Sequence, residues 1–142
     1  MRRLLIGVTC GALLFIVATS LPTDSWATST TASGVTVRVS TSPSHLTVGE
    51  VVTFAVLVRG PGVLDGAQID YGDGVGQGAN VGLVRCGQTK QIDHVSYLHH
   101  TYKTPGTYRF FDVVHFIGPE PFCMALKVVG SATIVVKKAS AG

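Results

Sequence analysis

Apolar and polar residues alternate along most of this chain with the period of two that indicates β-strands. In the first clear case, Val35, Val37 and Val39 are separated by polar residues. Turns rich in glycine and proline separate further runs of this kind, and no segment beyond residue 27 has a helical period. The expected strands span residues 35–40, 50–59, 66–71, 93–102, 107–117 and 124–137. Short strands without helices between them predict an all-β, antiparallel sandwich or barrel.

Three segments carry more specific expectations. Apolar residues on both faces of segment 50–59 predict a central strand that is covered on both sides. Gly130 predicts a bulge or bend in the last strand region. The glycine-rich segment 72–82 is expected to be irregular, with at most one short edge strand near residues 81–84.

The first 27 residues have the pattern of a secretory signal. Arg2 and Arg3 precede about 15 apolar residues at 4–18, after which small and polar residues follow. Ser25 and Ala27 offer the small side chains that a signal peptidase reads, so we expect cleavage after Ala27. The alternative is an uncleaved membrane anchor, but the apolar run is shorter than the roughly 20 residues that a spanning helix needs.

The mature chain is therefore expected to be secreted and to lack a membrane span. Segment 28–34 consists of small and hydroxylated residues without apolar period, which predicts a flexible leader. Residues 35–137 are expected to form one sandwich domain, and residues 138–142 a short tail.

Two cysteines, Cys86 and Cys123, remain once the signal that contains Cys10 is removed. In an oxidising compartment, two thiols most simply form one disulfide. Such a bridge would close a loop of about 38 residues, which the chain-entropy model equates with roughly 4 kcal/mol of stability. A zinc site would need more soft ligands than these two cysteines supply.

Charge and motifs exclude two broad functions. The formal net charge is +3, and the basic residues are scattered apart from the pair Lys137 and Lys138, whereas a nucleic-acid binder would gather them in a stripe. No Gly-x-Ser-x-Gly nucleophile motif occurs, and neither cysteine has a base at a known catalytic spacing. We therefore expect neither a nucleic-acid partner nor catalysis.

Two linked motifs suggest a family. An aspartate, an aromatic residue and a Gly-Asp-Gly turn are followed downstream by His-Thr-Tyr and then by Pro-Gly-Thr-Tyr. This order and spacing resemble the polycystic kidney disease (PKD) domain, an immunoglobulin-like β-sandwich found in many secreted and surface proteins. The resemblance implies a single immunoglobulin-like sandwich with structural roles for the matching residues. These are Asp70, Tyr71, Gly72, Asp73, Gly74, His100, Tyr102, Pro105, Gly106 and Tyr108.

The chain departs from the family pattern at three places. Ile69 stands where the family usually has tryptophan, and segment 74–94 is longer than typical. Strict alternation also turns Asp112 inward, where a lone carboxylate is costly. Either a bulge at Phe110 and Phe111 turns Asp112 outward, or Asp112 has a buried partner; we expect the bulge.

The acidic turn and the histidines are the candidate metal ligands. Asp70 and Asp73 could bind calcium if Asp65 or Asp93 approached them, and some PKD-like domains do bind it. The favoured interpretation is that these aspartates accept hydrogen bonds from turn amides. His99 and His100 are adjacent on an expected strand and so point to opposite faces, which argues against a shared metal. Calcium is thus the one cofactor kept open, and otherwise none is expected.

The expected function is a non-catalytic, monomeric, secreted module that mediates interaction with an extracellular protein or glycan. A Cys86–Cys123 bridge would tie the long insert to the loop after the aromatic strand, and binding residues often gather on such loops. The alternatives are a spacer module of a cell-surface assembly, a calcium-stabilised accessory domain, and a subunit that assists a separate catalytic chain.

Overall fold

The computed structural model describes residues 28–43, 45–80, 90–121 and 123–139 of this chain. These residues form nine strands and no helix. The strands are β1 (Thr28–Ala32), β2 (Val35–Ser42), β3 (Leu46–Thr47), β4 (Val51–Pro61), β5 (Val63–Asp70), β6 (Gly76–Asn80), β7 (Gln91–Thr101), β8 (Gly106–Ile117) and β9 (Ala125–Lys137). Within these residues, no helix has the length and apolar character needed to cross a membrane.

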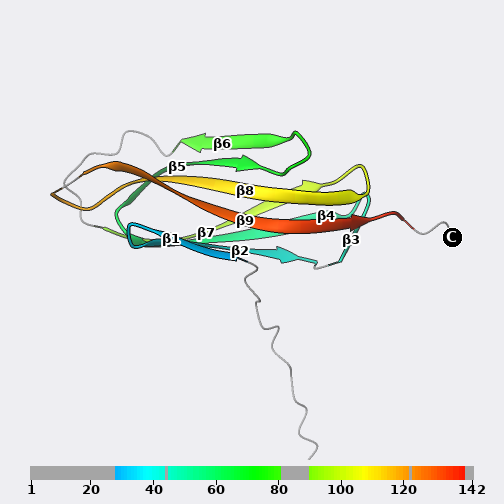
Figure 1. Cartoon of the computed structure of the whole chain (residues 1–142), viewed down its shortest axis with the longest axis horizontal. Coiled ribbons are helices and arrows are strands. Elements are labelled where there is room, and N and C mark those ends of the chain that lie inside the picture. The colour runs from blue at the N-terminus through cyan, green and yellow to red at the C-terminus, as the bar shows by residue number, and fades with distance from the viewer. Residues whose placement is uncertain (1–27, 44, 81–89, 122, 140–142) are drawn as a thin grey trace, which may run out of the picture.

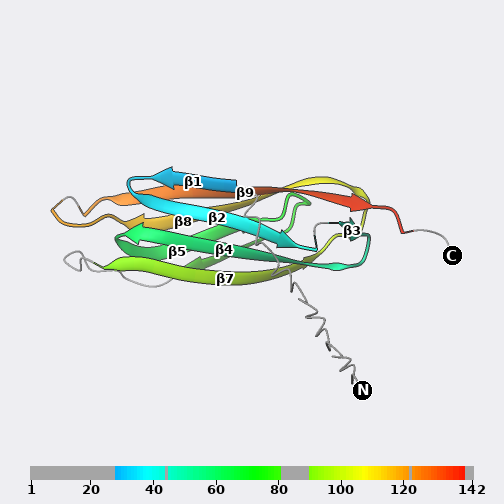
Figure 2. The ribbon, with the colours of Figure 1, turned by 90° about the horizontal axis from the view of Figure 1, so that it is seen from below.

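The strands pair into two sheets that lie face to face (Figure 1). The first sheet has the order β1-β2-β4-β7, and Figure 2 shows its strands side by side. The second sheet has the order β3-β9-β8-β5-β6. Apart from the short parallel pairing of β3 with β9, all pairings are antiparallel. The predicted all-β, antiparallel class is therefore confirmed for the described residues.

Aliphatic and aromatic side chains fill the space between the two sheets. Inward positions on the first sheet include Val37 and Phe54, and those on the second include Phe110 and Phe116, all at most 1% exposed. The rings of Phe54 and Phe110 stack across the interface with centroids 4.2 Å apart. Each fully buried side chain of this kind contributes about 1.5–3 kcal/mol, so this core is the main source of stability.

Strand β9 runs without interruption through Gly130, where we predicted a bulge or bend. Its register with β8 is continuous from Ala125 to Val136, so that prediction was wrong. A Cβ atom at position 130 would lie 2.6 Å from Val37 Cγ1 and 2.8 Å from Val39 Cγ2. The glycine is needed because β9 packs directly onto the valines of β2, and a side chain would not fit between them.

Residues 28–32, which we predicted to be part of a flexible leader, form strand β1 instead. This strand pairs with β2 from Thr28↔Val39 to Ala32↔Val35. Ser33 and Gly34 have φ of 50° and 79°, as a tight type I′ hairpin turn requires. The apolar period is missing because an edge strand of threonines and serine satisfies backbone hydrogen bonds while covering little core.

Strand β4 is central in the first sheet, but it is not covered on both sides as predicted. It lies between β2 and β7, and its inward residues are buried. On its other face, Leu57 is buried, Ala55 is half-buried and Val51 is 56% exposed. The apolar residues on this face therefore form part of an outer surface.

The glycine-rich segment 72–82 contains β6, an edge strand that precedes the position at which we expected one. β6 pairs with β5 from Asp70↔Gly76 to Gly66↔Asn80. Residues 81–84, for which a short edge strand was predicted, lie outside the described residues. Glycine does not prevent pairing here because an edge strand needs backbone hydrogen bonds on one side only.

The turns gather at two ends of the sandwich (Figure 1). We call one the motif end, which contains the β5–β6 turn at 71–75 and the β7–β8 turn at 102–105. The other, the far end, contains the β8–β9 turn at 118–124 and the β4–β5 turn at Gly62. The residues that resemble the PKD motifs lie in or next to the β5–β6 and β7–β8 turns, so the fold brings them together at the motif end.

Candidate functional site

The acidic turn at the motif end is held by hydrogen bonds within the turn. The Gly72 N–H donates to Asp70 Oδ1 at 2.8 Å, and the Val75 N–H donates to Asp73 Oδ1 at 3.2 Å. Gly72 has a φ of 83°, and a Cβ at this position would lie 2.5 Å from the Arg109 carbonyl oxygen. These carboxylates therefore shape the turn, and glycine is required where the turn passes β8.

A His100–Asp73 pair joins the acidic turn to the first sheet. His100 Nε2 lies 2.7 Å from Asp73 Oδ2, and their side chains are 12% and 19% exposed. Partial desolvation acts to raise the pKa of the Asp73 carboxyl, but hydrogen bonds from His100 and the Val75 N–H outweigh it and lower that pKa. Asp73 is therefore held as a carboxylate that connects the two sheets.

Four aromatic rings continue this connection into the core. Tyr71 stacks on His100 at 4.1 Å, and Tyr102 stacks on Tyr108 at 4.3 Å. The edge-on contact between His100 and Tyr102, at 4.7 Å, joins the two pairs. The buried Tyr102 hydroxyl donates to the Tyr71 carbonyl oxygen at 2.9 Å, and burial raises the pKa of Tyr102.

The same network fixes the β7–β8 turn. The Tyr108 hydroxyl donates to the Thr104 carbonyl oxygen at 2.8 Å, while the Gly49 N–H donates to the Tyr102 carbonyl oxygen at 3.1 Å. Pro105 precedes Gly106, the first residue of β8. The motif residues thus make most of their polar contacts with one another or with the backbone of these turns, which gives them a structural role.

The other candidate metal ligands are dispersed. Asp93 pairs with Arg59 at 2.8 Å, His99 contacts Thr53 Oγ1 at 3.0 Å, and the His94 ring contacts Ser96 Oγ at 3.0 Å. No group of three His, Cys, Asp or Glu residues suited to a metal ion occurs in the part of the chain that the structure describes. Neither a histidine site nor a calcium cluster is therefore assembled among the described residues.

The two cysteines of the predicted disulfide are placed only in part. Cys123 is half-buried in the β8–β9 turn at the far end, with a φ of 38°, and its N–H donates to the Pro119 carbonyl oxygen at 3.4 Å. Cys86 lies outside the described residues. The Cys86–Cys123 pairing therefore stays a prediction, as does the signal at 1–27, which also lies outside them.

Asp112 faces inward, so the bulge that we expected at Phe110 and Phe111 was wrong. β8 pairs with β9 in continuous register, and the irregularity lies in β5, between Leu64 and Gly66. Asp112 is 3% exposed, and its Oδ1 has no hydrogen-bond partner. Burial raises the pKa of this carboxyl to about 6.

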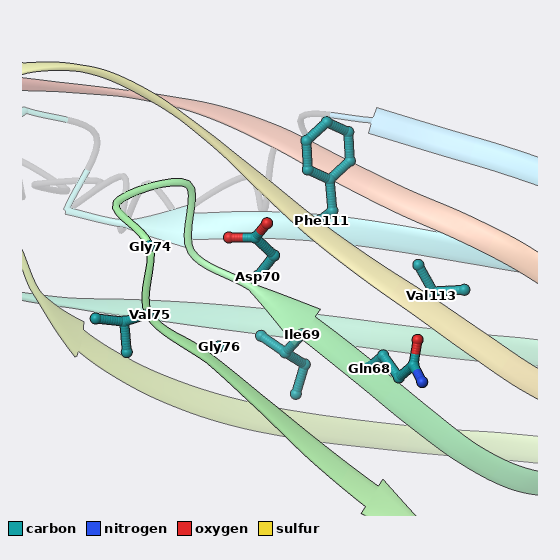
Figure 3. Close-up of a pocket in the computed structure, with 8 residues that line it drawn as sticks. All are labelled: Gln68, Ile69, Asp70, Gly74, Val75, Gly76, Phe111 and Val113. Atoms are coloured by element: carbon teal, nitrogen blue, oxygen red, sulfur yellow. The ribbon is translucent and has the colours of Figure 1, made fainter.

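A hollow on the outer face of the second sheet was not anticipated from sequence. It has a volume of about 540 Å³ and lies beside the β5–β6 turn, where Figure 3 shows its lining residues. Gly76 and Gly78 of β6 lie opposite Asp70 and Gln68 of β5 on the same face. Because these glycines have no side chains, the sheet is left open next to Phe111.

The surface of this hollow, which we call the outer-face hollow, combines an aromatic ring with polar groups. The Arg109 guanidinium lies over the Phe111 ring, 5.0 Å from its centroid. Among the described residues, no hydrogen-bond partner is found for the side chains of Gln68 and Arg109. A ring flanked by unused donors and acceptors could bind an amphipathic, hydroxyl-rich ligand. The sequence could have indicated the hollow only if residues 76–80 had been identified as a strand, because Gly76 and Gly78 then lie on the same face.

Comparison with known proteins gives a likeness in structure but not in sequence. No family model matches the chain, and no curated protein matches it. The solved PKD domain of an M14-like peptidase from Thermoplasmatales archaeon SCGC AB-540-F20 matches with a TM-score of 0.50 and 16% identity. The match covers 70% of this chain and 91% of that domain. At this identity the likeness concerns the fold alone, and the fold of this chain is PKD-like.

Proposed function

We propose that this chain is a non-catalytic, secreted PKD-like module that binds an extracellular protein or glycan through the outer-face hollow. The observation that carries the proposal is the hollow itself, in which Phe111, Gln68 and Asp70 lie on a face of the sheet that Gly76 leaves open. The signal pattern at 1–27 supports an extracellular setting.

The chemistry of the hollow favours a glycan over a protein. A sugar ring presents an apolar face and a rim of hydroxyls, so it needs an aromatic surface together with amide and carboxylate groups. Phe111 supplies the aromatic surface, the exposed Asp70 lies opposite it in the register of β5 and β8, and the exposed Gln68 lies opposite Val113 (Figure 3).

The proposal is tested by titrating the isotope-labelled protein with a panel of defined oligosaccharides and recording backbone amide shifts. We expect saturable shifts at Gln68, Gly76 and Val113, because these residues line the hollow. Phe111→Ala should weaken the affinity by about tenfold through loss of ring contact. Gln68→Ala should also weaken binding, since Gln68 lines the hollow and its side chain is exposed there.

Tyr97→Ala is the matched control, because Tyr97 is 68% exposed on the outer face of the other sheet. Its affinity should equal that of the unaltered protein. If no oligosaccharide shifts the hollow while a cell-surface protein does, the ligand is a protein. If neither the oligosaccharides nor a cell-surface protein shifts the amides of the hollow, or if Phe111→Ala leaves such shifts unchanged, the binding role is wrong. The spacer interpretation then replaces it.

A further inference from the structure

A second, smaller cavity lies between the two sheets at their open edge. It has a volume of about 100 Å³ and is bounded by β4, β5, β6, β7 and β8. Aliphatic side chains such as Val56, Val58 and Leu64 form much of its wall. It reaches the surface between β6 and β7, where Ala79 and His94 are exposed.

Asp112 brings a carboxylate to this cavity from β8. In the register of the second sheet, Asp112 lies between Ile69 of β5 and Gly130 of β9, and neither neighbour offers a polar side chain. Asp112 is 3% exposed and Oδ1 accepts no hydrogen bond. Its charge is felt by Tyr71, whose pKa is raised by burial and by the nearby Asp112 carboxylate.

A buried carboxylate with an unused oxygen is unfavourable unless something compensates its charge. No lysine or arginine of the described residues lines the cavity. A compensating cation can therefore enter from solution, or from another molecule, through the open edge.

The donor set around the cavity selects the kind of cation. Calcium takes six to eight oxygen ligands, and zinc takes about four nitrogen or sulfur ligands. Here the polar side chains are those of Asp112, Ser96 and His94. An ammonium group fits better, because it has three N–H donors for the Asp112 carboxylate and the Ser96 hydroxyl, while an alkyl tail packs on the aliphatic wall.

We propose that this cavity is a binding site for a primary alkylammonium group, with Asp112 as its counter-ion. The volume, about that of three water molecules, admits an ammonium nitrogen and two or three carbons. Two sources share this chemistry: a small free alkylamine and the tip of a lysine side chain presented by a partner. The site is separate from the outer-face hollow and does not depend on the function proposed for it.

The test is a titration of the intact protein with n-propylammonium chloride near pH 8, at which the amine is protonated. Amide shifts on β7 and β8 report binding, and sodium chloride at equal ionic strength is the reference. We expect saturable shifts at Ser96 and Asp112, and none with 1-propanol, which has the same length without the charge. Asp112→Asn should weaken binding by about tenfold or more, since a charged hydrogen bond is lost.

A second variant guards against misfolding of Asp112→Asn. Ala67→Val keeps the carboxylate but adds bulk to the wall of the cavity, and it should also abolish the shifts. Asp93→Asn removes an equal charge from the exposed face of β7 and should leave the affinity unchanged. Lysine with blocked termini, compared with propylammonium, distinguishes the two sources: a site that takes a partner's lysine binds both, whereas a site for a small free amine binds propylammonium alone. The Nζ-acetylated lysine is the uncharged control.

Equal shifts with propylammonium and 1-propanol would show that the cavity accepts an apolar tail without regard to charge, and the proposal would be wrong. Equal affinities for the unaltered protein and Asp112→Asn would overturn it as well. Absence of saturable shifts with every ammonium compound would leave Asp112 as an uncompensated core carboxylate.

Discussion

Asp112 shows how far one residue can depart from the pattern of the strand that holds it. The neighbouring inward positions of β8 are Phe110 and Val114, which are both buried in the core. A carboxyl at the intervening position is desolvated and lacks a partner at Oδ1. The residue is therefore expected to reduce stability wherever it is ionised.

The first prediction follows from this cost. Asp112→Asn should raise the free energy of unfolding near pH 8 by about 2–3 kcal/mol, because a shift of the carboxyl pKa from 3.8 to about 6 equals that amount. Urea denaturation at this pH measures it. Asp93→Asn, on an exposed ion pair, should change stability by less than about 1 kcal/mol. A less stable Asp112→Asn protein would mean that the carboxylate has a stabilising partner.

A second residue-scale prediction concerns the buried hydroxyl of Tyr102. Tyr102→Phe leaves the Tyr71 carbonyl oxygen without its 2.9 Å donor, which should cost about 1–3 kcal/mol of unfolding free energy. Tyr97→Phe is the control, since Tyr97 is 68% exposed and should shift stability by no more than about 0.5 kcal/mol. Similar effects of the two substitutions would mean that the Tyr102 hydroxyl does not stabilise the fold.

At the scale of elements, β9 and β2 illustrate how two sheets approach each other. Gly130 lies against Val37 and Val39, whose branched side chains have few alternative rotamers. The contact therefore cannot relax by rotation of a flexible side chain, and the spacing between the sheets depends on the missing Cβ.

Gly130→Ala should consequently destabilise the protein by about 1–3 kcal/mol through overpacking. Gly78→Ala is the matched control: its Cβ has room, and replacing a strand glycine there should be neutral or stabilising by about 0.5–1 kcal/mol. Urea denaturation of both variants gives the comparison. When Gly130→Ala is combined with Val37→Ala, the added methyl group has more room, so it should destabilise the protein less. An undiminished loss of stability would mean that the strain does not arise from the contact with Val37.

Most strands could be predicted from the period of two, because buried and exposed residues alternate on β2, β4, β8 and β9. The elements that sequence missed or misplaced, β1, β3 and β6, all lie at the edge of a sheet. Their backbone pairs on one side only, so β1 and β6 form without a run of apolar side chains. The acidic turn was recognisable from its residues, whereas the outer-face hollow was not. It depends on the register of β6 against β5, which places Gly76 and Gly78 on one face.

At the scale of the whole molecule, the two ends of the sandwich differ in how they are held. The motif end is fixed by the His100–Asp73 pair and the stacked rings. At the far end, Cys123 lies in the β8–β9 turn, which backbone hydrogen bonds close, and we propose that a bond to Cys86 constrains this end further. In a secreted chain with this bridge, the side-chain network would constrain the motif end and the disulfide would constrain the far end.

Intact mass measurement of the exported protein tests this proposal. The expected mass corresponds to a chain that starts at Thr28, and denaturation with a thiol-alkylating reagent should add nothing until a reductant is present. Cys86→Ser provides the comparison, since it should leave one alkylatable thiol and lower stability by about 2–5 kcal/mol. Retention of Cys10, or two reactive thiols without reductant, would contradict both the cleavage and the bridge.

The dependence of stability on pH combines the buried Asp112 carboxyl with the hydrogen-bonded Asp73 carboxyl and has an unusual form. The folded-state pKa of Asp112 is raised, so its contribution to stability is greatest below 3.8 and declines as the pH rises to about 6. The pKa of Asp73 is lowered, so its contribution is present above the unfolded-state value and is lost as the pH falls through the folded-state value.

The combined contribution of these two carboxyls should therefore reach its maximum at about pH 4 and fall toward neutrality, instead of continuing to rise. Tyr71 and His94 are the other titratable side chains that face Asp112 or its cavity, and a difference curve against Asp112→Asn removes their contributions. Urea denaturation between about pH 3 and pH 8 should show a decline of about 2–3 kcal/mol in the unaltered protein that Asp112→Asn lacks. Asp73→Asn should instead reduce the loss of stability that occurs as the pH falls below about 4, because it removes a carboxyl whose pKa is lowered in the folded state. If the two curves run parallel between about pH 4 and pH 7, the Asp112 carboxyl titrates alike in the folded and unfolded chains, and the cavity already compensates its charge.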